Sequence, residues 1–208
     1  MNLKYYYWYF QSVIPERICD DIIRYGKEQN KEMALTGNAG KDKKKLTKLE
    51  LKNIQKKRKS DIVWMNDRWI YNEIQPYVHA ANANAGWNFE WDFSESCQFT
   101  EYKKSQFYDW HCDSYEEPYD NPENQNVHGK LRKLSMTVSL TDPDEYAGGD
   151  LEFDFRNQDE ASQPRVCEEI RSKGSVVVFP SFVWHRVKPV TKGIRHSLVC
   201  WNIGYPFK

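Results

Sequence analysis

The sequence has no long apolar run, no closely spaced cysteine pair and no excess of either charge. Without a run of about 18 apolar residues it has no candidate transmembrane helix, and its N-terminus lacks the apolar segment and cleavage site of a secretory signal. The five cysteines are odd in number and fit neither a disulfide framework nor a zinc module. The sequence therefore predicts a soluble, cytoplasmic protein with reduced thiols and no membrane partner.

Charge and chain length further limit the class of protein. Lys+Arg and Asp+Glu each number 30, so no nucleic-acid partner is expected from the global charge. Locally, residues 41–59 are mostly basic, whereas residues 109–123 and 142–160 are mostly acidic. The 208 residues, 15% of them aromatic, are sufficient for one domain with a sizeable core over residues 1–208. The oligomeric state stays open.

A His-x-Asp motif ends the segment Tyr102–Asp113. On a β-strand, residues i and i+2 point to the same side, so His111 and Asp113 can converge on one ion. A second imidazole, His185, follows the apolar run Val176–Phe179. Two histidines and one carboxylate form the facial triad of non-haem Fe(II) oxygenases, which leaves coordination positions open.

Arg195 follows His185 by ten residues. A guanidinium group can hold a carboxylate through two parallel hydrogen bonds. Strand alternation puts Arg195, Ser197, Val199 and Trp201 on one face. A lone His-x-Asp is weak evidence, but its combination with a later strand histidine and this arginine is far less probable by chance.

Helices are expected mainly in the first half of the chain. One begins at Ser12 or Pro15 and ends near Gly26, and an amphipathic helix covers Asn66–Ala85. Residues 36–59 are rich in Gly, Asn and Lys. They are interpreted as a solvated loop with one short helix, and a mobile basic flap over the site is the alternative.

The remaining segments are rich in β-formers. Short strands separated by Gly, Pro, Asn and Asp argue for a sandwich or jelly roll, and helices packed on one face would make the fold α+β. The expected strands are Tyr5–Phe10, Ser60–Trp64, Trp87–Phe93, Ser96–Tyr102, Phe107–Cys112, Leu131–Leu140, Asp150–Phe155, Arg165–Ile170, Ser175–Phe179, Phe182–Lys188 and Ile194–Ile203.

At Tyr102–Asp113 and Gly174–Trp201 the sequence resembles the 2-oxoglutarate/Fe(II) dioxygenases of the prolyl 4-hydroxylase type, including their short bacterial, viral and fungal members. The resemblance covers essentially the whole chain. It implies a double-stranded β-helix, which is a jelly-roll, cupin-like barrel, with N-terminal helices packed on one face. Residues 1–95 would then be support, and residues 96–208 the catalytic core.

The resemblance also assigns the central site residues. It implies that His111, Asp113 and His185 bind Fe(II) and that Arg195 binds the distal carboxylate of 2-oxoglutarate. Tyr102 matches the family tyrosine that donates a hydrogen bond to the same co-substrate.

Further positions follow from the family's patterns. Ser135 is a candidate second donor to the carboxylate, and Ser197 is a weaker one. Trp201 matches a tryptophan of the site wall. Tyr108 and Trp110 flank the triad and are expected to line the substrate pocket, with core packing as the alternative.

The chain departs from the family pattern at two places. Ser105 stands where the Tyr-x-x-Gly segment has glycine, and an acidic insertion occupies residues 120–126. His79 is expected to be a surface or packing residue, and His128 and His196, which have no motif support, are expected at the surface.

The activity implied by the resemblance consumes O2 and 2-oxoglutarate, with ascorbate as reductant, and couples decarboxylation to succinate with C–H hydroxylation. The first hypothesis is hydroxylation of a proline in a protein or peptide. Free proline, another side chain or a small metabolite is the alternative substrate. A metal-binding barrel without turnover and a zinc hydrolase are also open, although neither needs the carboxylate clamp of Arg195.

The charge runs suggest how a substrate could be covered. The basic stretch Gly37–Lys59 could close on the acidic segment Asp113–Glu123, with screening acting over about 8–10 Å at ordinary salt. That arrangement predicts a proline-containing target with a basic or mixed flank, bound in an extended form.

Overall fold

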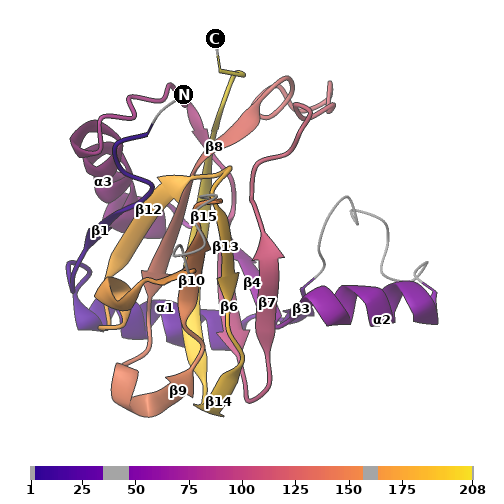
Figure 1. Cartoon of the computed structure of the whole chain (residues 1–208), viewed down its shortest axis with the longest axis vertical. Helices are drawn as coiled ribbons and strands as arrows, with labels where there is room; N and C mark the ends of the chain where they lie inside the picture. Colours follow the sequence, from indigo (N-terminus) through magenta and orange to yellow (C-terminus); the bar gives the residue numbers. More distant parts are fainter. Residues whose placement is uncertain (1–2, 35–46, 157–163, 208) are drawn as a thin grey trace.

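The computed structural model describes residues 3–34, 47–156 and 164–207 (Figure 1). Two short 3-10 helices, Pro143–Glu145 and Glu168–Ile170, accompany the main elements. The helices and strands are β1 (Trp8–Phe10), α1 (Glu16–Glu28), β2 (Glu32–Met33), α2 (Lys48–Lys57), β3 (Arg58–Lys59), β4 (Asp61–Met65), α3 (Arg68–Asn84), β5 (Phe93–Ser94), β6 (Cys97–Tyr102), β7 (Phe107–His111), β8 (Leu131–Ser139), β9 (Tyr146–Gly148), β10 (Leu151–Asp154), β11 (Arg165–Val166), β12 (Val176–Pro180), β13 (Trp184–Val187), β14 (Val190–Gly193) and β15 (Arg195–Gly204).

Two antiparallel sheets build the framework. Within the described residues, the larger sheet has the order β1-β12-β8-β15-β6-β4-β2, with β5 added on β15, and the smaller has the order β11-β10-β13-β7-β3. A separate ribbon pairs β9 with β14. The α+β jelly-roll architecture predicted from the strand pattern is thereby confirmed.

The core has two layers because the larger sheet is covered on both faces. Strand β12 contacts both layers: Val176 and Val178 belong to the cluster that α1 and α3 join, whereas Val177 and Phe179 belong to a cluster with Phe153 of the smaller sheet. Successive side chains of a strand point to opposite faces. Strand β12 is apolar without interruption because both of its faces are buried, as is typical of strands covered on both sides.

Helices α1 and α3 occupy the positions expected of them. Pro15, not Ser12, precedes the first turn of α1, where its fixed φ suits the helix start. Helix α1 continues two residues past the possible stop at Gly26 and ends at Glu28. Gly26 instead permits close packing, since a Cβ there would lie 2.6 Å from Cδ1 of Phe99.

Helix α2 is the short helix expected within residues 36–59. Thr47 and Glu50 form a capping box at its start, and α2 then projects sideways from the sheets instead of packing beside α1 and α3 (Figure 1). Its C-terminal end leads directly into Arg58, whose strand β3 pairs with β7. Of the proposed flap, residues 37–46 lie outside the described residues.

Several strand boundaries differ from the predictions. The expected strand Trp87–Phe93 is reduced to β5, because Asn82 bonds both the N–H and the carbonyl of Phe89 and holds a loop there. The expected strand Arg165–Ile170 splits into β11 and a 3-10 turn. Strands β9 and β14 were not predicted. No helix in the described part of the chain has the length and apolar character needed to cross a membrane.

Candidate metal centre

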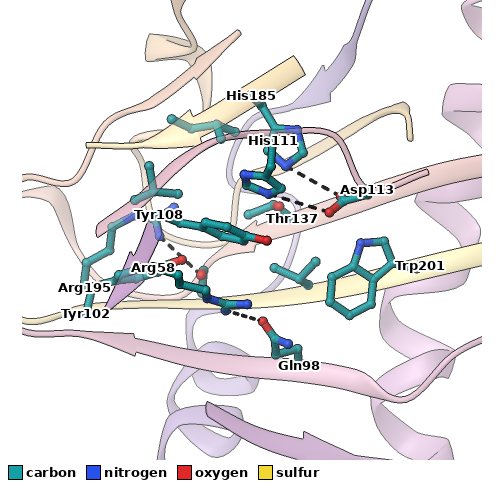
Figure 2. Close-up of a pocket in the computed structure, with 14 residues that line it drawn as sticks. Arg58, Gln98, Tyr102, Tyr108, His111, Asp113, Thr137, His185, Arg195 and Trp201 are labelled. Atoms are coloured by element: carbon teal, nitrogen blue, oxygen red, sulfur yellow. Dashed lines mark hydrogen bonds and ion pairs between the residues drawn. The ribbon is translucent and has the colours of Figure 1, made fainter. Parts of the chain in front are cut away.

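Three of the predicted ligands meet at one end of the smaller sheet. His111 ends β7 and lies opposite His185 of β13 in the strand register. The N–H of Asp113 donates to the carbonyl of Ser181, which fixes the segment after β7 against the β12–β13 loop. The Asp113 carboxylate lies 3.7 Å from Nε2 of His111 and 3.6 Å from Nε2 of His185 (Figure 2).

Backbone contacts determine which imidazole nitrogens are free. Nδ1 of His111 lies 2.7 Å from the carbonyl oxygen of Asp109, and Nδ1 of His185 lies 3.0 Å from that of Val183. A carbonyl oxygen can only accept, so each Nδ1 carries a proton and each Nε2 faces the carboxylate. One donor atom from each of His111, Asp113 and His185 lies within 4.8 Å of the others. This donor set suits a divalent cation.

The protonation states match that interpretation. Burial, reinforced by the neighbouring His185, lowers the pKa of His111 to about 3. Burial by itself would raise the pKa of Asp113, but interactions with His185, His111 and Arg132 and the hydrogen bond from Ser135 bring it to about 2. At neutral pH, His111 is neutral and Asp113 is ionised, as metal ligands must be.

A β-bulge places one more aromatic ring beside the centre. His185 pairs with His111, but Val187 pairs with Tyr108, so β7 carries an extra residue over this interval. The bulge brings Tyr108 to the same side as His111, and their rings stack with centroids 3.5 Å apart. Trp110 is not among the lining residues and instead contacts Arg186, whose guanidinium carbon lies 4.6 Å from a Trp110 ring centroid. The structure thus brings Tyr108, but not Trp110, into the pocket wall.

Most of the predicted site residues line one pocket beside His111, Asp113 and His185. Its cavity volume is about 30 Å³, which holds a few water molecules at most, so a larger guest requires side chains to move. The face predicted for β15 lines it. The lining consists of Arg58, Gln98, Tyr102, Tyr108, His111, Asp113, Thr137, Leu151, His185, Val187, Arg195, Ser197, Val199 and Trp201.

Arg195 is buried at one side of this pocket. Its side chain donates to the hydroxyl of Ser197 at 3.3 Å and lies over the ring of Tyr102, with 5.6 Å to the ring centroid. Among the described residues, no carboxylate lies within ion-pair distance of Arg195. Gly149 leaves room for it, because a Cβ there would lie 2.9 Å from Cδ of Arg195.

Ser135 has a different contact from the predicted one. Its hydroxyl donates to the Asp113 carboxylate at 2.7 Å and lies 2.9 Å from the hydroxyl of Ser181, and it is absent from the pocket lining. Thr137, two residues later on β8, lines the pocket instead. This geometry favours Ser135 as a residue that positions Asp113 over a role in contacting a co-substrate.

The histidines without motif support are at the surface with one exception. His79 is exposed and stacks against Trp91, and His128 is partly exposed. The prediction for His196 is wrong. It is buried, with Nδ1 3.0 Å from the hydroxyl of Thr141 and Nε2 3.2 Å from the Glu101 carboxylate. This polar pairing compensates for burying the imidazole.

Five lining residues were not predicted from the sequence, namely Arg58, Gln98, Thr137, Leu151 and Val187. Gln98 and Thr137 could have been found, because alternation places Gln98 on the face of Tyr102, and Thr137 on the face of Ser135. Arg58 gave no such signal, since it closes a lysine-rich stretch interpreted as a solvated loop. Only the pairing of β3 with β7 brings it into the pocket.

A jelly roll that presents two imidazoles and a carboxylate beside a buried arginine has the architecture of a mononuclear metal oxygenase. A family model described as "2OG-Fe(II) oxygenase superfamily" matches residues 97–202. This span is just over half of the chain and includes all four of those residues. The chain belongs to the 2OG-Fe(II) oxygenase superfamily.

Sequence relatives named as hydroxylases match parts of the chain. A PKHD-type hydroxylase of Hyphomonas neptunium is 37% identical over 90 residues, which are 43% of this chain and 37% of that protein. A PKHD-type hydroxylase of a Synechococcus species is 42% identical over 72 residues, which are 35% of this chain and 30% of that protein. The chain therefore spans well under half the length of these relatives.

Solved structures share the fold over nearly the whole chain. A viral collagen prolyl hydroxylase from Paramecium Bursaria Chlorella virus-1, solved as a 2OG complex, superposes with a TM-score of 0.65 at 19% identity and covers 97% of both chains. A Pseudomonas putida prolyl-4-hydroxylase gives a TM-score of 0.65 at 17% identity, covering 96% of this chain and 93% of that one. These likenesses confirm the double-stranded β-helix fold.

Proposed function

We propose that the protein is an Fe(II)- and 2-oxoglutarate-dependent dioxygenase that hydroxylates a proline in a protein or peptide. The observation that carries this proposal is the presence, in one cavity, of the His111, Asp113 and His185 donor set and a buried Arg195 without a carboxylate partner among the described residues. A structural metal site or a hydrolase has no need of the arginine.

His111, Asp113 and His185 would hold the metal through Nε2, a carboxylate oxygen and Nε2. The bound Fe(II) supplies O2 activation that couples decarboxylation of 2-oxoglutarate to succinate with hydroxylation of a substrate C–H bond. The backbone carbonyls of Asp109 and Val183 orient the two imidazoles with Nε2 toward the metal position, and Ser135 fixes the Asp113 carboxylate.

Arg195 would bind the distal carboxylate of 2-oxoglutarate. Burying a guanidinium group is costly unless an anion compensates, and a carboxylate matches its two parallel N–H groups. Tyr102 and Ser197 lie beside it and would orient the same carboxylate. The indole N–H of Trp201 is buried without a partner among the described residues, so it is available to a guest in the pocket.

The choice of proline is supported by the names of the relatives and neighbours, which include PKHD-type hydroxylases and prolyl hydroxylases. Free proline, another side chain or a small metabolite remains the alternative substrate. Ascorbate as reductant, a single catalytic domain over residues 1–208 and a cytoplasmic place of action belong to the same proposal.

The test is anaerobic reconstitution with Fe(II) and 2-oxoglutarate, followed by O2 and a panel of proline-containing peptides. We expect succinate and a peptide mass gain of one oxygen atom. Arg195→Gln should raise the KM for 2-oxoglutarate strongly, because losing a buried charge-assisted pair costs about 2–5 kcal/mol. Arg195→Lys should restore part of the affinity for 2-oxoglutarate. Absence of succinate from the iron-loaded wild type would refute the activity, and succinate without peptide oxidation would refute the substrate.

A further inference from the structure

Three arginines surround the pocket, and only one of them has a carboxylate partner among the described residues. Arg132 donates to Glu95 at 2.5 Å and stacks on Trp201, with 4.0 Å to the ring centroid. Arg195 and Arg58 are both buried in the wall without such a partner. One of these two is accounted for by 2-oxoglutarate, so one cationic group remains unassigned.

Arg58 is held in place by neutral groups. Its Nε donates to the hydroxyl of Ser60 at 3.0 Å, and its Nη2 donates to Oε1 of Gln98 at 2.5 Å. Its guanidinium carbon lies 4.4 Å from the ring centroid of Tyr108, which in turn stacks on His111. Of the five N–H groups of an arginine, these contacts use two. The remaining three are available to a ligand.

Arg58 and Arg195 contact different parts of the wall. Arg58 pairs with Tyr108 through β3 and β7, whereas Arg195 pairs with Tyr102 through β15 and β6. In Figure 2 the two guanidinium groups lie at separate places around Tyr108. One dicarboxylate held at Arg195 therefore leaves Arg58 for a second molecule, which in this pocket is the substrate.

The segment that carries Arg58 is also basic. Helix α2 exposes Lys52, Lys56 and Lys57, and Lys59 follows in β3. No ion pair joins these four lysines to an acidic group in the described part of the chain. Positive side chains beside a pocket raise the local concentration of anions and speed their entry. A substrate approaching along α2 is favoured when it is acidic, contrary to the basic or mixed flank expected from the sequence.

We propose that Arg58 recognises a carboxylate of the substrate, so that the preferred substrates are acidic close to the carbon that is hydroxylated. This inference rests on the proposed function. Two sources offer the same chemistry, namely an Asp or Glu side chain next to the target proline and the free carboxylate of a small amino acid. A carboxylate can accept two parallel N–H groups of Arg58, which is stronger than the single neutral contact to Gln98.

The test compares substrates that differ only in charge beside the proline. Peptides with Asp, Asn or Lys next to the target proline are compared by kcat/KM, and free proline is compared with prolinamide to test the second source. Wild type should prefer the acidic member of a pair by about 10- to 100-fold, the range expected for a charge-assisted hydrogen bond. Arg58→Gln should reduce that preference to about twofold or less, and Arg58→Lys should retain part of it.

Turnover of 2-oxoglutarate without a second substrate distinguishes failure of the Arg58 inference from failure of the proposed function. Arg58→Gln should keep its KM for 2-oxoglutarate near the wild-type value, which also shows that the centre is intact, and Lys192→Gln on the exposed ribbon is a control that should change nothing. An equal preference for Asp and Asn in wild type, or a preference that survives in Arg58→Gln, overturns the inference. So does a raised KM for 2-oxoglutarate in Arg58→Gln, or salt-sensitive binding of an oligonucleotide in place of any acidic-peptide preference. A wild type without uncoupled turnover refutes the proposed function itself.

Discussion

At the scale of single residues, the centre depends on hydrogen bonds that hold its ligands. Each imidazole is oriented by a carbonyl two residues earlier in the chain, and the Asp113 carboxylate is oriented by Ser135. Such partners of ligand residues contribute to metal affinity because they fix the position of the donor atom. The chain therefore prepares the donor set through local backbone geometry and one buried hydroxyl.

Ser135→Ala tests this account of Ser135. We expect Fe(II) affinity to fall by roughly 10- to 100-fold, because the Asp113 carboxylate loses its orienting donor. The KM for 2-oxoglutarate, measured with saturating iron, should stay near the wild-type value.

Ser197→Ala is the matched comparison, since Ser197 contacts Arg195 and not Asp113. It should affect the 2-oxoglutarate KM and leave iron affinity unchanged. If Ser135→Ala instead raises the 2-oxoglutarate KM with normal iron affinity, the co-substrate role predicted from the family pattern is correct.

The sequence predicts these residues unequally, for physical reasons. His111, Asp113, His185 and the β15 face follow from strand alternation, which is a local property. Tyr108 follows only when a bulge shifts the register of β7 against β13, and such a shift depends on the partner strand. Arg58 likewise depends on long-range pairing.

At the scale of elements, periodic segments were predicted well and irregular ones were not. The spacing of apolar residues was sufficient for α3, whose Pro76 lies inside the helix. Strands β9 and β14 are short and contain Gly148 and Gly193, both with positive φ, so neither shows a strand pattern. Their pairing is set by the tertiary fold, which a local pattern cannot reveal.

The turn between β6 and β7 stores local strain. Ser105, which replaces the family glycine, has a φ of 67°, in the left-handed region that favours glycine. Ser105→Gly should therefore raise the free energy of unfolding by about 0.5–1 kcal/mol, since relief of strain exceeds the added chain entropy. Denaturant unfolding measures the change.

Lys104→Gly is the control in the same turn. Lys104 is exposed and is not among the residues with positive φ. Glycine there should lower the free energy of unfolding by about 0.5–1 kcal/mol. Destabilisation by both substitutions would show that the backbone at Ser105 is not strained.

At the scale of the whole molecule, a buried polar network joins distant segments. Glu101 of β6 accepts from Lys31 at 2.8 Å and contacts His196 of β15. Burial raises the pKa of Glu101, but hydrogen bonds from Lys31 and Lys103 bring it to about 2. Burial lowers the pKa of His196 to about 4, an effect strengthened by Lys27 and opposed by Glu101.

This network predicts a pH dependence of stability. The folded pKa of His196 lies below that of a free histidine, so the unfolded state binds more protons between pH 6.5 and 4. The contribution of neutral His196 to the free energy of unfolding is complete above pH 6.5 and is lost as the pH falls toward 4. In His196→Gln, the free energy of unfolding should fall by roughly 1–3 kcal/mol less than in wild type between pH 6.5 and 4. Urea unfolding of metal-free protein measures this difference. Equal slopes in both proteins would contradict the assignment.

Anaerobic iron binding to wild type, His185→Ala and His128→Ala tests the three-residue centre. We expect one tightly bound Fe(II) per wild-type chain and its loss in His185→Ala, with both proteins still folded, while the partly exposed His128 is dispensable. Wild-type iron affinity retained in His185→Ala, or lost equally in His128→Ala, would contradict the centre formed by His111, Asp113 and His185.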